Sequence, residues 1–192
     1  MQIPGPAGML QAELDHPHGD LDPIAVLCHP HPQYGGSMYD AVLATAAKVL
    51  LGRQTNCLRF NFRGVGQSEG TYDGGVGEVA DLWAVHQWVA QSYPDAPILW
   101  LGYSFGANVV WHGLSQAAPA TAVLIAPPVG TMTFEEIELP DTTVHAIAGA
   151  DDDFVDTAKL DTLAGSNVVV LPGADHFFSG AHDALAAALT GL

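Results

Sequence analysis

The pentapeptide Gly102-Tyr103-Ser104-Phe105-Gly106 is the part of the sequence whose residue types and spacing most clearly suggest chemistry. It follows an apolar run and precedes a stretch with helical spacing. G-x-S-x-G at such a strand-to-helix turn exposes a serine hydroxyl as a nucleophile, and glycines are needed there because side chains would collide within the turn. The alternative is a structural serine that caps the following helix. We expect Ser104 to be a nucleophile.

Such a serine needs a base, and the sequence contains nine histidines. His176 follows the last apolar run in a Gly-Ala-Asp-His turn, from which an imidazole can swing over the nucleophile. We expect His176 to be the base, with His29 and His31 as the main alternatives. The remaining histidines lie in the polar N-terminal segment or inside predicted helices and a predicted strand: His16, His18, His86, His112, His145 and His182.

The base in turn needs a carboxylate that fixes its tautomer and stabilises the imidazolium. Asp151, Asp152 and Asp153 are contiguous, so only one of them can point inward. Repulsion among three neighbouring carboxylates leaves the other two in solvent. Asp175 is a poorer candidate, because neighbours in sequence rarely face each other in a turn.

An oxyanion formed at this serine needs two N–H donors. The residue after the nucleophile, Phe105, supplies one. The loop after the first apolar run supplies the other, and His31 is its first donor after His29, because the prolines there have no N–H. A metal site at His29 and His31 is the alternative, but they lie in a proline-locked turn without a third soft ligand nearby. We expect no metal.

The elements that must position these residues follow from periodicity. Short runs rich in Val, Ile and Leu alternate with longer amphipathic stretches, which predicts an α/β protein with a mostly parallel sheet covered on both faces. The predicted strands are Ile24–Cys28, Asn56–Phe62, Ile98–Tyr103, Ala122–Ala126, Val144–Ala148 and Val168–Leu171. The predicted helices are Tyr39–Leu51, Gly77–Ser92, Ser104–Ala117, Asp156–Leu163 and Ala181–Leu189.

In such a sheet, ligands bind outside the carboxyl ends of the strands. Ser104, the aspartate cluster and His176 each follow a predicted strand, in the order Ser, Asp, His. The sequence has no repeat and no linker, so we expect one domain over residues 1–192.

Composition narrows the class of protein. The 192 residues suffice for one domain with its own core, and a hydrophobic content of 48% excludes intrinsic disorder. The 21 acidic and 5 basic residues give a net charge of −16, which excludes nucleic acid as a partner because such a surface repels phosphates.

The cysteines and the lengths of the apolar runs indicate where in the cell we expect the protein. Cys28 and Cys57 form no disulfide framework and lie in apolar runs, where a free cysteine behaves as a small buried hydrophobe. No apolar stretch reaches the roughly 18 residues of a membrane span, and the N-terminus lacks the pattern of a signal peptide. We expect a cytoplasmic protein that forms a monomer or a small homo-oligomer.

Together these motifs resemble those of the α/β-hydrolase superfamily. His29-Pro30-His31-Pro32 with Gly35-Gly36, and the run Arg59–Gly66, look like those of the small, lidless bacterial α/β hydrolases related to dienelactone hydrolase. The resemblance extends from about Ile24 to Phe178 and implies a single-domain α/β-hydrolase fold. In that family the acid lies in Gly-x-x-Asp-x-x-Val, which maps onto Gly149–Val155 and implies Asp152.

Two departures limit what the resemblance implies. Dienelactone hydrolases use a cysteine where this chain has Ser104, so dienelactone is not an implied substrate. Only the segment Pro127–Thr143, about 17 residues long, joins two of the predicted strands, which is too short for a helical cap.

The implied activity is that of a serine esterase without a cofactor. We expect small, neutral, short-acyl esters as substrates, since the net charge disfavours anionic ones. Thioester, amide or peptide cleavage by the same residues, or a non-catalytic binding role, are the alternatives. Four aromatic residues lie close enough to the motifs to line an acyl pocket, with core packing as their alternative: Tyr34, Tyr103, Phe134 and Phe177.

Overall fold

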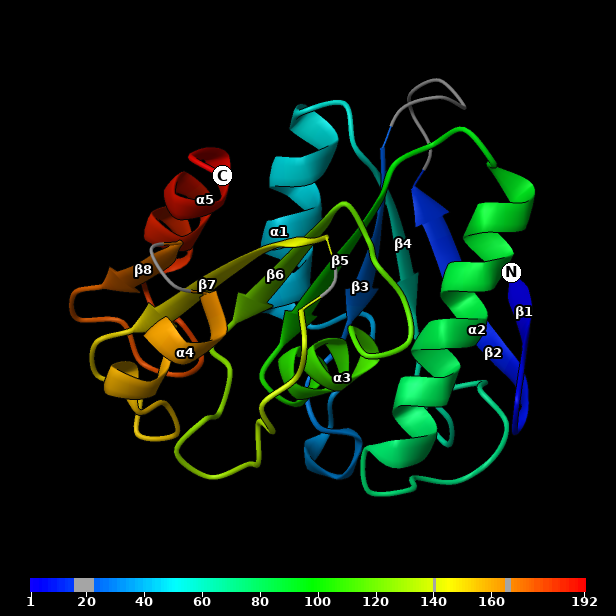
Figure 1. Ribbon diagram of the computed structural model, residues 1–192, viewed down its shortest axis with the longest axis horizontal. Helices are drawn as coiled ribbons and strands as arrows, with labels where there is room; N and C mark the ends of the chain where they lie inside the picture. The colour runs from blue at the N-terminus through cyan, green and yellow to red at the C-terminus, as the bar shows by residue number, and fades with distance from the viewer. Residues whose placement is uncertain (16–22, 140, 165–166) are drawn as a thin grey trace.

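The computed structural model describes residues 1–15, 23–139, 141–164 and 167–192. In this part of the chain, a single sheet of eight mostly parallel strands forms the centre of the molecule (Figure 1). The spatial order is β1-β2-β4-β3-β5-β6-β7-β8. β2 is antiparallel to both β1 and β4, and all the other neighbouring pairs, including β4 with β3, are parallel. The strands are β1 Gln2–Gly5, β2 Gly8–Asp15, β3 Ile24–Cys28, β4 Asn56–Phe60, β5 Ile98–Tyr103, β6 Thr121–Ile125, β7 Thr143–Gly149 and β8 Val168–Leu171.

Helices cover both faces of this sheet. In Figure 1, α2 and α3 pack together in front of the sheet, while α1 lies behind it and packs against α5. The helices are α1 Ala41–Gly52, α2 Val76–Ser92, α3 Phe105–Gly113, α4 Asp161–Ala164 and α5 His182–Thr190. The predicted α/β class with a mostly parallel sheet is therefore confirmed.

The structure differs from the predicted elements in three places. The hairpin of β1 and β2 was not predicted. In β2 the buried Leu10 and Ala12 alternate with more exposed residues, because only one face of this antiparallel strand meets the core. The predicted helix Ser104–Ala117 ends at Gly113, and the predicted helix Asp156–Leu163 is a 3₁₀ turn, Thr157–Lys159, followed by the short α4.

The register of the parallel strands places their carboxyl ends at one edge of the sheet. Cys28 pairs with Gly102, Tyr103 with Ile125, and Gly149 with Leu171. The segments that leave these strands, with Ser104, the aspartate cluster and His176, consequently emerge together at the lower edge in Figure 1.

The described residues between β6 and β7 contain no helical cap. Within the described parts of residues 126–142, the chain forms no helix or strand. Among the described residues, no helix is long and apolar enough to cross a membrane.

A buried ion pair holds the loop that follows β4. The Arg63 guanidinium donates to both carboxylate oxygens of Asp81 on α2, at 3.0 and 2.7 Å, and Asp81 is fully buried. On the same helix, the fully buried Glu78 accepts from the N–H groups of Asp73 and Gly75. These bonds fix the loop from which Tyr72 reaches the site described next.

Candidate active site

Ser104 lies at a sharp turn between β5 and α3. Its backbone is left-handed, with φ 54° and ψ −118°, and its N–H donates to Ile125 O at 2.9 Å. A Cβ atom on Gly102 would overlap the backbone of Gly106, so the turn closes only because Gly102 lacks a side chain. The predicted elbow is thus the conformation that the structure has.

A second close approach brings α3 to the end of β3. A Cβ atom on Gly106 would overlap the carbonyl group of Cys28 and crowd that of His29. The amino end of α3, which carries Phe105, therefore lies directly against the start of the loop that carries His31.

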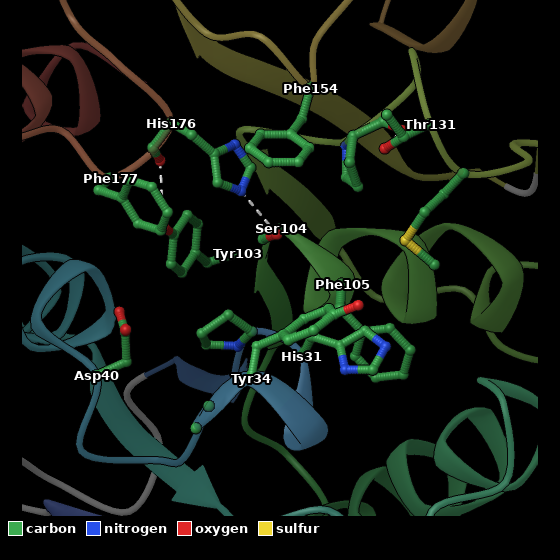
Figure 2. Close-up of a pocket in the computed structure, with 15 residues that line it drawn as sticks. His31, Tyr34, Asp40, Tyr103, Ser104, Phe105, Thr131, Phe154, His176 and Phe177 are labelled. Carbon is green, nitrogen blue, oxygen red and sulfur yellow. Dashed lines mark hydrogen bonds between the residues drawn. The ribbon is translucent and has the colours of Figure 1, made fainter.

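A continuous chain of hydrogen bonds joins Asp152, His176 and Ser104. Asp152 Oδ2 lies 2.8 Å from His176 Nδ1. His176 Nε2 lies 2.9 Å from Ser104 Oγ, the bond between these two side chains that is dashed in Figure 2. A carboxylate only accepts, so Nδ1 carries the proton and Nε2 is free to accept the serine hydroxyl. The imidazole is therefore in the tautomer that can take a proton from Ser104.

The three aspartates of the cluster differ in burial, as expected from the repulsion among their charges. Asp152 is 7% exposed, and its other oxygen, Oδ1, accepts from Phe154 N at 2.9 Å, whereas Asp151 and Asp153 are exposed. A buried carboxylate is stable where its oxygens are hydrogen-bonded, and the two neighbouring carboxylates remain hydrated.

Backbone contacts hold the His176 turn against the end of β7. The Asp151 N–H donates to Ala174 O at 3.0 Å, and a Cβ atom on Gly149 would overlap that same carbonyl. The Tyr103 hydroxyl donates to His176 O at 3.1 Å. Asp175 does not contact the imidazole of His176 and instead accepts from the N–H groups of Phe177 and Ser179.

The two predicted oxyanion donors, His31 and Phe105, both lie beside Ser104 in the lining of one pocket. Within the described part of the chain, neither backbone N–H has a hydrogen-bond partner. The Phe105 N–H is the first of α3, where orphan N–H groups and the helix dipole favour a negative charge.

His29 fixes the orientation of the His31 N–H. Its Nε2 accepts from Phe62 N at 3.0 Å, so its Nδ1 carries the proton and donates to Pro30 O at 2.6 Å. The C=O and N–H of a trans peptide point in opposite directions. The Pro30–His31 peptide, held by its carbonyl, therefore directs the His31 N–H away from the His29 ring.

The ring of His31 is held as well. Its Nδ1 accepts from Gln33 N at 3.2 Å, and its Nε2 lies 3.1 Å from the Tyr72 hydroxyl. The ring also contacts those of Tyr34 and Phe105, with centroids 4.6 and 4.9 Å away. Each nitrogen of the two histidines considered as metal ligands thus has a protein partner.

A pocket of about 600 Å³, a size typical of small-molecule sites, surrounds Ser104. Tyr34, Tyr103 and Phe177 line it, as predicted. The prediction for Phe134 is wrong, because its ring packs on Trp111 of α3, with centroids 6.3 Å apart, and does not line the pocket. The lining also includes residues that the sequence analysis did not assign: Asp40, Pro128, Thr131, Met132 and Phe154.

For two of these residues, Phe154 and Asp40, the sequence contains a partial indication of their position. Phe154 lies within the Gly149–Val155 motif, and its ring is 4.7 Å from that of His176. Asp40 stands where a helix N-cap is expected, but no pattern indicates that the N-cap of α1 also faces the pocket.

The remaining histidines lie elsewhere. His86 stacks on Trp83, His112 contacts Thr133 O, and His182 bonds Thr45. His145 lies in β7, and burial lowers its pKa. His16 and His18 lie outside the described residues.

Comparison with known proteins decides the family. A sequence model of the X-Pro dipeptidyl-peptidase (S15) family matches residues 11–158. The chain belongs to the S15 family of α/β hydrolases. An uncharacterized protein of Rickettsia prowazekii (strain Madrid E), RP471, is 33% identical over 189 residues, which cover 91% of this chain and 79% of that protein.

Solved structures agree with this member of the S15 family in fold. XC6422 from Xanthomonas campestris, described as an α/β serine hydrolase without a lid, is 34% identical with a TM-score of 0.91, over 100% of this chain and 91% of that chain. An α/β serine hydrolase homologue from Coxiella burnetii is 35% identical with a TM-score of 0.91, over 100% of this chain and 95% of that chain. The predicted lidless α/β-hydrolase fold is confirmed.

His29 makes stability depend on pH. Burial lowers its pKa from 6.5 to about 4, because desolvation disfavours the charged ring. His29 contributes about 3 kcal/mol to the free energy of unfolding at pH values above the pKa of the unfolded state. This contribution is lost as the pH falls from about 6.5 to about 4. Urea unfolding of the wild type and of His29→Gln between pH 4 and 7.5 measures this loss. A difference between the two proteins that does not vary with pH would contradict the assignment.

Proposed function

We propose that this protein is a serine hydrolase that cleaves small, neutral, short-acyl esters through Ser104, His176 and Asp152. The observation that carries the proposal is the hydrogen-bond chain from Asp152 to Ser104, which ends beside two unpartnered backbone N–H groups in one pocket of the described structure. The chemistry of acyl transfer needs this combination of activated nucleophile and oxyanion donors.

The reaction begins with attack of Ser104 Oγ on the ester carbonyl carbon. His176 Nε2 takes the hydroxyl proton while Asp152 holds Nδ1–H and stabilises the imidazolium. The oxyanion accepts from the N–H groups of His31 and Phe105.

Collapse of this tetrahedral species expels the alcohol, to which His176 returns the proton, and leaves an acyl group on Ser104. Water, deprotonated by His176, then attacks the acyl-enzyme and releases the acid. The protein's own groups supply every proton transfer in this sequence.

Peptide cleavage is the second candidate, and the match to a family described as X-Pro dipeptidyl-peptidase favours it. The same triad can cleave an amide, so the leaving group is the variable to test. A panel of an aryl ester, a thioester and an aminoacyl-proline anilide separates the two candidates by kcat/KM. The cytoplasmic location and the monomeric or small homo-oligomeric state stay predictions from the sequence.

Ser104→Ala should abolish ester turnover, because no other hydroxyl lies within reach of His176 Nε2 in the described structure. The free energy of unfolding should change by less than about 1 kcal/mol, since the change removes one hydroxyl and little packing. Turnover of an aryl ester and urea unfolding provide the two measurements. Ser115→Ala, an exposed serine just past α3, is the matched control. A Ser104→Ala protein that keeps most of the wild-type rate would rule out the nucleophile.

Asp152→Asn should lower kcat by a factor on the order of 10⁴, because an amide N–H facing Nδ1 selects the wrong imidazole tautomer. Asp151→Asn and Asp153→Asn make the same change of charge at exposed positions one residue away, so they should cost little. Steady-state kinetics of the three variants decide between the carboxylates. The assignment fails if either flanking variant is the most damaging.

Acyl chains of about two to six carbons should give the highest kcat/KM. The pocket has no cap among the described residues, so longer chains find little further surface against which each CH₂ could gain its roughly 0.8 kcal/mol. A chain-length series of neutral aryl esters tests this. A maximum at twelve or more carbons, or activation at a lipid interface, would show that the loops around Gln33–Tyr39 or Thr131–Leu139 form a covered acyl channel.

A further inference from the structure

One end of the pocket carries a negative charge that the triad does not use. Of the 15 residues that line it, Asp40 is the only acidic one, and none is Lys or Arg. Figure 2 shows the Asp40 carboxylate on the side of Tyr103 and Phe177, with Thr131 at the opposite end. The pocket is therefore electrostatically asymmetric.

The carboxylate of Asp40 is only half engaged. Oδ1 caps α1 by accepting from Val42 N at 2.8 Å and Leu43 N at 3.3 Å. In the described part of the chain, Oδ2 has no hydrogen-bond partner, and no Lys, Arg or His lies within 4.0 Å of the carboxylate. Burial raises the pKa of Asp40, while its two backbone hydrogen bonds and the charge of His182 act in the opposite direction.

Aromatic rings complete this end of the pocket. Phe177 is 62% exposed at the rim of this end, whereas the Tyr34 ring lies against that of His31, with centroids 4.6 Å apart. The Tyr103 hydroxyl is committed to His176 O, which leaves the ring to face the pocket. Figure 2 shows Tyr103 on the same side of the pocket as Asp40, and burial together with the charges of Asp40, Asp152 and Asp175 raises the pKa of Tyr103. A carboxylate among aromatic faces is the chemistry that binds ammonium groups.

We propose that Asp40, Tyr103 and Phe177 form a cation subsite, so that of two short-acyl esters of the same shape this enzyme prefers the one that carries an ammonium group. The inference rests on the proposed ester hydrolysis and extends its substrates beyond neutral esters. The subsite attracts the cation through the free Oδ2 and the ring faces, while the scissile carbonyl lies at Ser104. The net charge of −16 adds a long-range attraction of the same sign.

Matched ester pairs test the subsite. The first pair is the acetate ester of choline and its carbon isostere, in which a tert-butyl group replaces the trimethylammonium group. The second pair carries the same exchange on the acyl side, in ethyl trimethylammoniobutyrate and its isostere. In at least one pair, the wild type should prefer the cation by about tenfold in kcat/KM, and the preference should fall as salt screens the charge.

Asp40→Asn is the decisive variant, because asparagine caps a helix as well as aspartate does and the fold is preserved. It should reduce the cation-to-isostere ratio to about one. Asp95→Asn, which removes an exposed carboxylate near the opposite edge of the sheet, should keep the wild-type ratio. A wild-type ratio of one or less in both pairs, or a ratio that Asp40→Asn leaves unchanged, overturns the subsite while leaving ester hydrolysis intact.

Direct binding separates failure of the subsite from failure of the proposed function. Tetramethylammonium is titrated into the wild type, Asp40→Asn and Asp95→Asn, and binding is followed by NMR. The Kd should rise about tenfold in Asp40→Asn alone. If no ester is hydrolysed, the proposed function fails and this titration still decides the subsite. Equal Kd values in all three proteins overturn it.

Discussion

The whole site depends on close backbone contacts that only glycine permits. Gly102 and Gly106 approach each other across the Ser104 turn, and Gly106 also lies against the Cys28 and His29 carbonyls. Gly149 makes the equivalent contact with the turn before His176. A methyl group at any of these positions would overlap main-chain atoms that cannot move independently, because they belong to the buried sheet or to its immediate exits. These contacts fix the distances between the backbone of Ser104, the turn before His176 and the N–H groups of His31 and Phe105 before any side chain contributes.

Buried polar groups then orient what the backbone brings together. The neutral imidazole of His29 bonds both the Phe62 N–H, just after β4, and the Pro30 carbonyl. It therefore connects the loop after β3 to the end of the neighbouring strand. The Arg63–Asp81 pair fixes the next loop, from which Tyr72 contacts the His31 ring. Each of these bonds restricts a peptide or ring that borders Ser104. An oxyanion site gains most from such restriction, because donors that are already oriented need no reorganisation during the reaction.

The electrostatic character of the pocket depends on which carboxylates are shielded from it by burial and hydrogen bonds. Asp152 is buried and fully hydrogen-bonded, so its charge acts on His176 and is screened from a substrate. Asp40 lines the pocket with one oxygen free of partners in the described structure. In the proposed reaction Asp152 acts on the tautomer of His176, whereas at the proposed subsite Asp40 acts on the charge of the group that binds.

The sequence by itself determined the features that depend on neighbouring residues and on periodicity. The elbow around Ser104, the strand ends that carry the site and the α/β class are of this kind, and the motif around Asp152 pointed to the carboxylate that the structure buries. Tertiary packing decided the rest. The ring of Phe134 packs on Trp111, Asp40 lines the pocket, and β1 and β2 add two strands to the sheet. These outcomes depend on which distant segments meet, because a short strand, an N-cap or an aromatic ring is compatible with several neighbours until the sheet has formed.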